Sequence, residues 1–205
     1  MRAGRGRVLP RSFYDRETEI VAREMLGTVL ECETDDGVAS GIIVETEAYL
    51  GEHDLACHAA VGRTSRTEHL YGPPGISYVY FIYGMYDMFN IVTGKPGVAQ
   101  AVLIRAAEPL DSWQANLSGP GKLTREMRIT RADNGLDLTG RKLFLLRDPK
   151  DRPRVIESMR IGVDYAGEWK DALLRFSDAH SRAVSKPRPA GALRLRRSKR
   201  ATPSK

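Results

Sequence analysis

Apolar and polar positions alternate along two early segments, and this alternation predicts a β-hairpin. Residues 28–34 and 39–50 flank the sequence Asp35-Asp36-Gly37, and an Asp-Gly pair between alternating segments is a strong hairpin signal. The two-residue period divides the second segment into two faces, one with Ile43, Glu45, Glu47 and Tyr49 and the other with Ile42, Val44, Thr46 and Ala48. The pattern therefore predicts two carboxylates and a tyrosine on one face of a strand.

The remaining pattern predicts an α+β domain. Residues 15–27 predict a short helix capped by Asp15. Residues 77–94 predict a second hairpin with its turn near Tyr83 to Asp87, and residues 98–110 predict a strand in which Ala101, Leu103 and Arg105 alternate with Val102 and Ile104. Helical character begins at Gly119, and late strands are predicted over residues 142–148, 159–165 and 173–178. We expect one domain on a curved, mostly antiparallel sheet with surrounding helices.

Charge is distributed unevenly along the 205 residues. The net charge is +6, but residues 1–11 and 186–205 hold twelve of the thirty-two basic residues. Residues 12–185 therefore hold twenty basic and twenty-six acidic residues. We predict a basic N-terminal arm over 1–11, a folded domain over 12–185 and a basic, disordered tail over 186–205. The tail fits a solubilising segment and a non-specific nucleic-acid arm equally well.

Composition also narrows the class of protein. No apolar run approaches the ~20 residues of a membrane span, and the N-terminus lacks the apolar core of a signal peptide. Cys32 and Cys57 are too few for a disulfide framework. We therefore expect a soluble cytoplasmic protein without membrane association, which in a bacterium would be found with the nucleoid.

Candidate chemistry lies between residues 41 and 60. Glu47 and Tyr49 share a predicted strand face, and His58 follows nine residues after Tyr49. A carboxylate, an aromatic ring and an imidazole in one pocket could activate water beside a planar ligand. Glu45 also fits a solvated acid at a strand end, and His58 fits a structural histidine.

Two further features bear on this interpretation. His53, Cys57, His58 and His69 are close in sequence, but neither H-x-E with P-C-x-x-C nor H-E-x-x-H is present, so no metal site is predicted. Seven tyrosine or phenylalanine residues lie between Tyr71 and Phe89. They suit a core of aromatic β-residues, but Tyr83 at the predicted turn also suits insertion between bases.

Several motifs together resemble a known family. They are ETEAYLGEHDLACHA, GPPGISYVYFIYGMYDMFN, AVLIRAAEPL, SGPGKL followed by NGLDL, and RIGVDYAGEW. In this order and spacing, from about residue 8 to about residue 176, they resemble the alkyladenine DNA glycosylases, the 3-methyladenine excision enzymes unrelated to the helix-hairpin-helix type. The resemblance implies a monofunctional DNA glycosylase of base excision repair that removes alkylated or deaminated purines and needs no cofactor.

The resemblance also implies roles for individual residues. Glu47 matches the general base that activates water, and Glu45 matches a supporting acid without a catalytic step. Residues that match the pocket for the flipped base are Tyr49, His58, Tyr80, Asn90 and Arg105. Tyr83 matches the aromatic residue that intercalates from a protruding hairpin. The implied partner is duplex DNA with a damaged purine, approached through the minor groove by a monomer.

Phosphate contacts are expected from basic residues outside this pocket. Lys122 matches the family's G-P-x-K-L phosphate contact, and Arg63 and Arg66 lie in the loop before YGPPG. Basic residues recur every third position at Lys122, Arg125, Arg128 and Arg131. On a helix they would form a stripe beginning at an N-terminus that favours phosphate, although a solvated helix face explains Arg128 and Arg131 as well.

Some residues differ from the family pattern, and the sequence leaves other functions open. Leu70-Tyr71, Cys57 and Asp87-Met88-Phe89 depart from the residues usual in the family, and a carboxylate at Asp87 would repel a nearby phosphate. The alternatives are a damage-recognition protein without excision, a bifunctional glycosylase that uses a lysine Schiff base, and an RNA-binding module.

Overall fold

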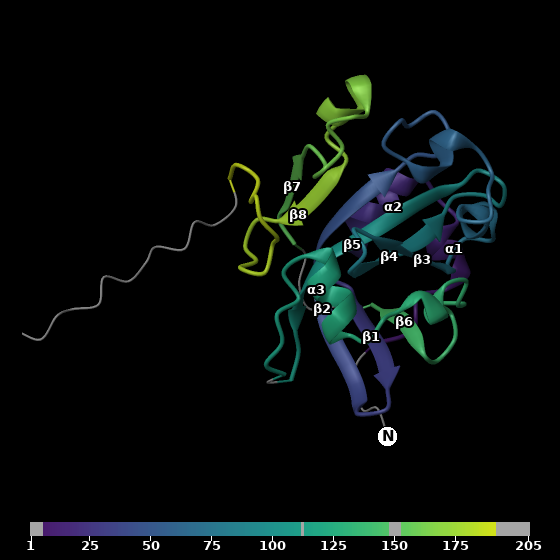
Figure 1. Ribbon diagram of the computed structural model, residues 1–205. Coiled ribbons are helices and arrows are strands. Elements are labelled where there is room, and N and C mark those ends of the chain that lie inside the picture. Colours follow the sequence, from purple (N-terminus) through teal and green to yellow (C-terminus); the bar gives the residue numbers. More distant parts are fainter. Residues whose placement is uncertain (1–5, 112, 148–152, 192–205) are drawn as a thin grey trace, which may run out of the picture.

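An antiparallel sheet forms the centre of the molecule (Figure 1). The computed structural model describes residues 6–111, 113–147 and 153–191. These residues form an eight-stranded sheet, in which six strands run in the order β3-β4-β5-β2-β1-β6 and β8 pairs with both β2 and β7. The strands are β1 Val29–Thr34, β2 Gly37–Tyr49, β3 Ser77–Ile82, β4 Tyr86–Thr93, β5 Gln100–Pro109, β6 Leu143–Leu146, β7 Val155–Ser158 and β8 Arg175–Asp178.

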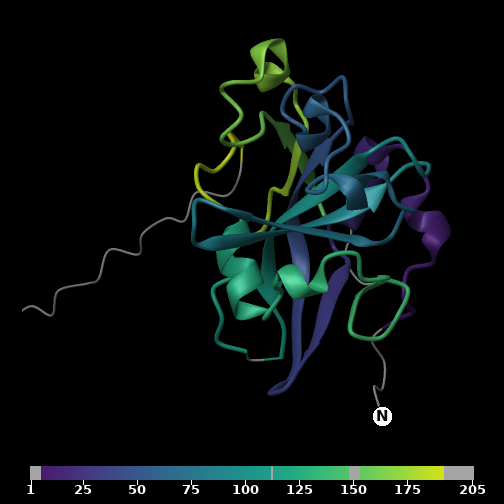
Figure 2. The same ribbon diagram turned by 45° about the vertical axis from the view of Figure 1, so that its right-hand side comes forward.

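Helices are short and pack on the curled sheet. They are α1 Arg11–Tyr14, α2 Thr18–Met25 and α3 Pro120–Glu126, with 3₁₀ helices η1 His58–Val61, η2 Glu68–Tyr71, η3 Arg131–Asp133 and η4 Gly167–Asp171. Helix α2 packs on β2 and β5, and α3 packs on β4 and β5 beside the β3–β4 hairpin (Figure 2). One large core cluster includes Val21 of α2, Ile43 of β2, Ile104 of β5 and Leu123 of α3, all fully buried. The predicted single α+β domain on a curved antiparallel sheet is confirmed.

Strand β2 changes its neighbour in the middle. Its first half pairs with β1 up to Ile42, and its second half pairs with β8 from Glu45 to Glu47. The register with β5 shifts between Ile43 and Thr46, so a β-bulge lies where the sheet divides. Bulges re-aim side chains next to functional sites.

The bulge changes the predicted faces of β2. Ile43 and Ala48 both lie in the main core cluster, and the Thr46 hydroxyl donates to the Ala22 carbonyl of α2 over 2.8 Å. Val44 packs in a different cluster. The predicted grouping of Ile43 with Glu45, and of Val44 with Thr46, is therefore wrong, because the extra residue of the bulge interrupts the two-residue period.

Two predicted elements are placed differently. Helix α2 begins after Glu17, and Asp15 instead ends α1. The strand predicted over 159–165 is absent, because Gly162 has a φ of 75° and the segment forms a loop after β7. The hairpin at Asp35-Asp36-Gly37 and the strands within 142–148 and 173–178 are confirmed.

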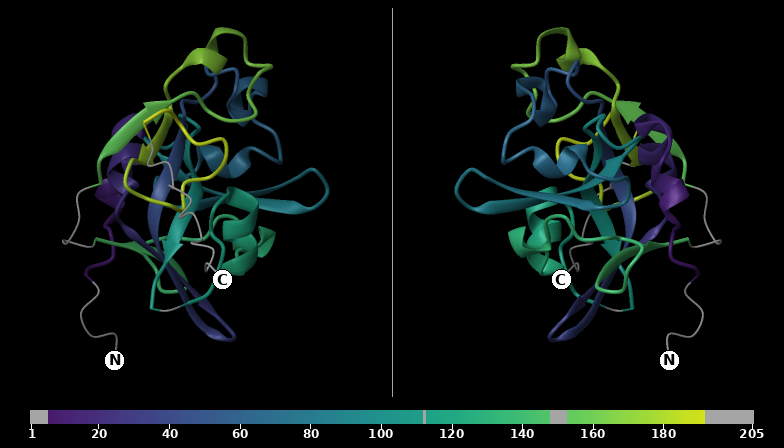
Figure 3. Two further views of the ribbon diagram at one scale, coloured as in Figure 1. Left: turned by 90° about the vertical axis from the view of Figure 1, so that its left-hand side faces the viewer. Right: turned by 90° about the vertical axis from the view of Figure 1, so that its right-hand side faces the viewer.

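The β3–β4 hairpin extends away from the body of the domain (Figure 3). Tyr83 and Gly84 have φ values of 54° and 67° and form its turn. Tyr83 is 75% exposed, so the predicted tyrosine lies at the tip of this hairpin.

The predictions for residues 1–5 and 192–205, within the basic arm and tail, lie outside the described residues. Within the described parts of the chain, every helix is too short or too polar to cross a membrane.

Candidate active site

A cavity of about 260 Å³ lies between β3, β4, β5 and the loops that carry residues 56–58 and 161–165. This is close to the lower end of the ~300–1,000 Å³ usual for small-ligand pockets. Six residues predicted from the sequence line it, namely Tyr49, His58, Tyr80, Tyr83, Asn90 and Arg105. Strand β5 contributes Ala101, Leu103 and Arg105 to the cavity and Val102 and Ile104 to the core, as its alternation predicted.

Aromatic rings form one wall of the cavity. The His58 and Tyr80 rings lie 4.4 Å apart between centroids, and Nδ1 of His58 is hydrogen-bonded to the Tyr78 hydroxyl at 3.0 Å. Burial, assisted by the Arg66 guanidinium, lowers the pKa of His58 from 6.5 to about 4. The imidazole is therefore neutral at pH 7, and His58 itself adds no positive charge to this wall.

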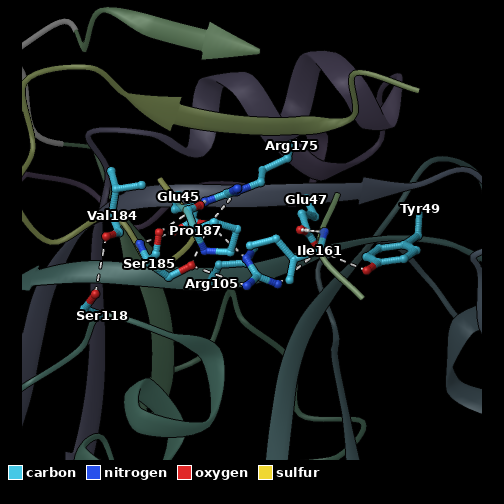
Figure 4. A network of polar contacts seen from close by, with 10 residues as sticks. All are labelled: Glu45, Glu47, Tyr49, Arg105, Ser118, Ile161, Arg175, Val184, Ser185 and Pro187. Carbon is cyan, nitrogen blue, oxygen red and sulfur yellow. Dashed lines mark hydrogen bonds and ion pairs between the residues drawn. The ribbon is translucent and has the colours of Figure 1, made fainter. Parts of the chain in front are cut away.

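Glu47 lies directly behind this cavity and is fully buried. Its Oε2 accepts a hydrogen bond from the Tyr49 hydroxyl over 2.9 Å and lies 3.3 Å from Nη1 of Arg105. Its Oε1 accepts a hydrogen bond from the backbone N–H of Ile161 over 2.9 Å (Figure 4). All three partners line the cavity. Burial and the Glu47 carboxylate raise the pKa of Tyr49 well above its usual value, so Tyr49 remains a donor.

Glu45 is also fully buried, so it is not the solvated acid considered from the sequence. Its Oε1 accepts hydrogen bonds from Nε of Arg105, Nε of Arg175 and the Ser185 hydroxyl over 2.9, 2.7 and 2.9 Å, and its Oε2 accepts one from the Ser185 N–H over 2.6 Å (Figure 4). Three of these donors share Oε1 and one reaches Oε2, so protein groups hold both oxygens of Glu45. Among the described residues, three donors reach Glu47, which leaves its Oε1 able to accept a further hydrogen bond.

Arg105 connects the two carboxylates. Burial opposes its charge, but Glu47 and then Glu45 outweigh burial and raise the pKa of Arg105. With Arg175, two guanidiniums balance two carboxylates inside the domain. Such a network is stable only if each group keeps its partners. These contacts therefore hold the Glu47 carboxylate in one orientation.

Asn90 lies on the cavity wall beside Tyr78. It is 3% exposed, and its Nδ2 donates to the Tyr78 carbonyl over 3.1 Å across the β3–β4 pair. This bond fixes the amide plane against the strand. Asn90 therefore presents a rigid polar group to whatever occupies the cavity.

The predicted phosphate-contact residues are all exposed, but their contacts differ. Lys122 is exposed on α3. Arg63 is exposed and forms an ion pair with Glu68 at 2.5 Å. Arg66 is exposed, and its guanidinium carbon lies 5.5 Å from the centre of the ring of Tyr80, which lines the cavity.

The predicted basic stripe does not form. Helix α3 ends at Glu126, so Arg128 and Arg131 lie beyond it, and Arg128 has a φ of 57° that ends helical geometry. Arg131 instead lies over the Phe81 ring at 4.1 Å and 3.3 Å from Asp87. This ion pair offsets the charge of the Asp87 carboxylate, which was expected to repel a nearby phosphate.

Several residues of the site were not predicted from the sequence. The loop after β7 supplies Ile161, Gly162, Val163 and Tyr165 to the cavity lining. Tyr165 is 70% exposed at this lining. The motif RIGVDYAGEW covers this loop, so the signal was present but was interpreted as a strand. Arg175 and Ser185 gave no such signal.

The described residues include no group of three or more His, Cys, Asp or Glu side chains that could hold a metal ion. Of the clustered residues noted in the sequence, His58 contacts Tyr80 and His53 contacts Trp169. Aromatic rings line the cavity, and buried carboxylates and guanidiniums lie beside it.

Comparison with known proteins assigns the family. A sequence model described as methylpurine-DNA glycosylase matches residues 12–182. The chain belongs to the methylpurine-DNA glycosylase family. It is thus a DNA glycosylase, a hydrolase that acts on DNA in repair, and the resemblance noted from the sequence is confirmed.

Relatives of this glycosylase align with it over nearly their whole length. Proteins named "Putative 3-methyladenine DNA glycosylase" include one from Legionella pneumophila (strain Lens), 50% identical over 88% of this chain and 99% of its own length. Others are from Myxococcus xanthus, 47% identical over 89% and 96%, and from Methanocella arvoryzae, 47% identical over 89% and 98%.

Proposed function

We propose that this glycosylase flips an alkylated or deaminated purine out of duplex DNA into the cavity and hydrolyses its N-glycosidic bond with water activated by Glu47. The observation that carries the proposal is the position of Glu47, a buried carboxylate whose three partners all line an aromatic cavity. Its Oε1 can accept a hydrogen bond from water. The water oxygen attacks C1′, its proton passes to Glu47, and the bonding electrons leave with the base. An abasic site remains.

The cavity suits a damaged purine. A 3- or 7-alkylated purine is cationic, so aromatic faces bind it better than a neutral base by about 1 to 2 kcal/mol. Tyr49, Tyr80 and the neutral His58 would hold the ring, and Asn90 would crowd the exocyclic amine of normal guanine. The positive charge also weakens the glycosidic bond, and flipping costs least for damaged bases.

The exposed hairpin tip suits insertion into DNA. Tyr83 adopts a positive φ that is uncommon for a bulky residue, and such strain is found preferentially at functional sites. Its exposed ring would fill the gap left in the stack, as aromatic wedges do in minor-groove binders. Lys122, Arg63 and Arg66 would contact phosphates, and a monomer would suffice for the reaction.

Single-turnover excision by Glu47→Gln tests the proposal. The variant should release base from a single-lesion duplex about 10² times more slowly or worse, because general-base catalysis contributes about 10² to 10⁴ in rate. Its affinity for a duplex with an abasic-site analogue should stay within a few-fold. An excision rate within threefold of the wild type would exclude Glu47 as the base.

A panel of single-lesion duplexes then defines the substrates. Rates for 3-methyladenine, 7-methylguanine, hypoxanthine and ethenoadenine should each fall with Glu47→Gln, and borohydride should trap no enzyme–DNA adduct. A trapped adduct would instead indicate a lysine Schiff base.

A further inference from the structure

Ser185 forms hydrogen bonds to both Glu45 and Arg105 in the buried network. Its N–H donates to Oε2 of Glu45 over 2.6 Å, and its hydroxyl donates to Oε1 over 2.9 Å. The hydroxyl oxygen also accepts a hydrogen bond from Nη2 of Arg105 over 3.3 Å. Ser185 is 3% exposed, so water cannot readily replace these bonds.

The segment around Ser185 is fixed on both sides. Val184 is fully buried in a small apolar cluster with residues of β2 and β5, and its carbonyl accepts a hydrogen bond from the Ser118 hydroxyl over 3.4 Å. The Pro187 carbonyl accepts one from Nη2 of Arg175 over 2.9 Å. Figure 4 shows this segment beside the network. Ser185 is thus held with both of its polar groups toward Glu45.

Arg105 carries the effect of Ser185 to Glu47. Its Nε binds Glu45, its Nη2 binds Ser185, and its Nη1 lies 3.3 Å from Oε2 of Glu47. A planar guanidinium bound at all three nitrogen atoms has one orientation. Without the serine hydroxyl the guanidinium can turn, and Nη1 then moves relative to Glu47.

We propose that Ser185 is a positioning residue for base excision, which fixes Arg105 and through it the orientation of Glu47. The proposal rests on the role of Glu47 proposed above. Ser185 lies beyond residue 182, where the family match ends. On this proposal, residues 184–187 belong to the active site although they lie outside the family match.

Ser185→Ala tests this role in single-turnover excision. The maximal rate at saturating enzyme should fall about tenfold, as expected for losing hydrogen bonds to charged groups. The affinity for an abasic-site duplex should stay within twofold, because Ser185 acts on the chemical step.

Ser181→Ala is the matched control. The Ser181 hydroxyl donates to Glu108 over 2.6 Å, and Ser181 is also 3% exposed. Ser181→Ala therefore loses a partly buried serine-to-glutamate hydrogen bond in the same segment without touching the network, and its maximal rate should match the wild type. Equal rates for the two alanine variants would overturn the proposal.

A double-mutant cycle with Glu47→Gln shows whether Ser185 acts through Glu47. On that background, Ser185→Ala should lower the residual rate by less than twofold. A full tenfold loss would mean that Ser185 acts elsewhere and would also overturn the proposal. If Glu47→Gln itself keeps the wild-type rate, the proposed function fails, whereas failure of the Ser185 proposal leaves the Glu47→Gln defect intact.

Discussion

Arg160 forms a bidentate ion pair with Asp54 in which both side chains are fully buried. Nη1 lies 2.5 Å from Oδ2 and Nη2 lies 2.8 Å from Oδ1. The guanidinium carbon also lies 4.8 Å from the centre of the Tyr49 ring, and Nη1 donates to the Ala48 carbonyl over 2.9 Å. The pair thus connects the loop after β7 to the end of β2 and supports the cavity wall from behind.

Asp54→Asn should destabilise the domain strongly. The substitution leaves Arg160 charged and buried without its partner, which typically costs about 3–5 kcal/mol. The free energy of unfolding from denaturant titration measures this loss. The control is Glu157→Gln, which breaks the exposed pair with Arg23 and should cost about 0–1 kcal/mol. Similar losses in the two variants would contradict a supporting role for the Asp54 pair.

His58 should make the stability depend on pH. Its pKa is about 4 in the folded protein against 6.5 when unperturbed, so below pH 6.5 the unfolded chain binds a proton that the folded chain refuses. The low pKa of His58 costs the folded state nothing above pH 6.5, and the free energy of unfolding decreases as pH falls from 6.5 toward 4. Between pH 7.5 and pH 5, the free energy of unfolding of the wild type should drop by about 1 to 2 kcal/mol more than that of His58→Asn. An equal drop in both proteins would show that His58 does not have this low pKa.

Local periodicity predicted which neighbouring residues share a strand face or a turn, whereas the family resemblance assigned Tyr80, Asn90 and Arg105 to the pocket. The alternation of β5 placed Leu103 and Arg105 together, and the two-residue spacing of Glu47 and Tyr49 brings the tyrosine hydroxyl to the carboxylate. The hairpin signal likewise located Tyr83 at a turn. Each of these relationships depends on neighbours in one strand or one hairpin, which a single sequence displays directly.

Long-range polar contacts could not be predicted in the same way. Glu45 is buried because Arg175 and Ser185 reach it from 130 and 140 residues away, and nothing near Glu45 in the sequence signals them. The bulge in β2 and the N–H of Ile161 are backbone features without a residue pattern. The loop after β7 shows the converse difficulty, because its apolar alternation imitates a strand.

Removing residues 192–205 should weaken non-specific binding to duplex DNA without slowing excision. This segment holds six basic residues, and each phosphate neutralised contributes a slope of about −0.9 to log K against log salt. The cut spares Ser185 and Pro187, so the excision rate at saturating enzyme should not change. Binding isotherms at several salt concentrations measure the slope.

A full-length variant with those six residues replaced by Gln is the matched control for the truncation. It should give the same flattened slope, because the effect is attributed to charge and not to length. Coincident slopes for the wild type and both variants would show that the tail does not contact phosphate.

Tyr83→Ala and Tyr80→Ala should separate the hairpin tip from the cavity wall. Tyr83 is exposed at the tip, whereas Tyr80 lines the cavity beside His58. Loss of the tip ring should lower the flipped fraction of every lesion alike, by the ~1 to 3 kcal/mol that aromatic stacking on a base supplies. Loss of Tyr80 removes a surface that binds the base, so its cost should be greater for a cationic lesion than for a neutral one. Single-turnover rates on one lesion of each charge measure both effects. A larger change in the ratio of these rates for Tyr83→Ala than for Tyr80→Ala would reverse the assignment of tip and wall.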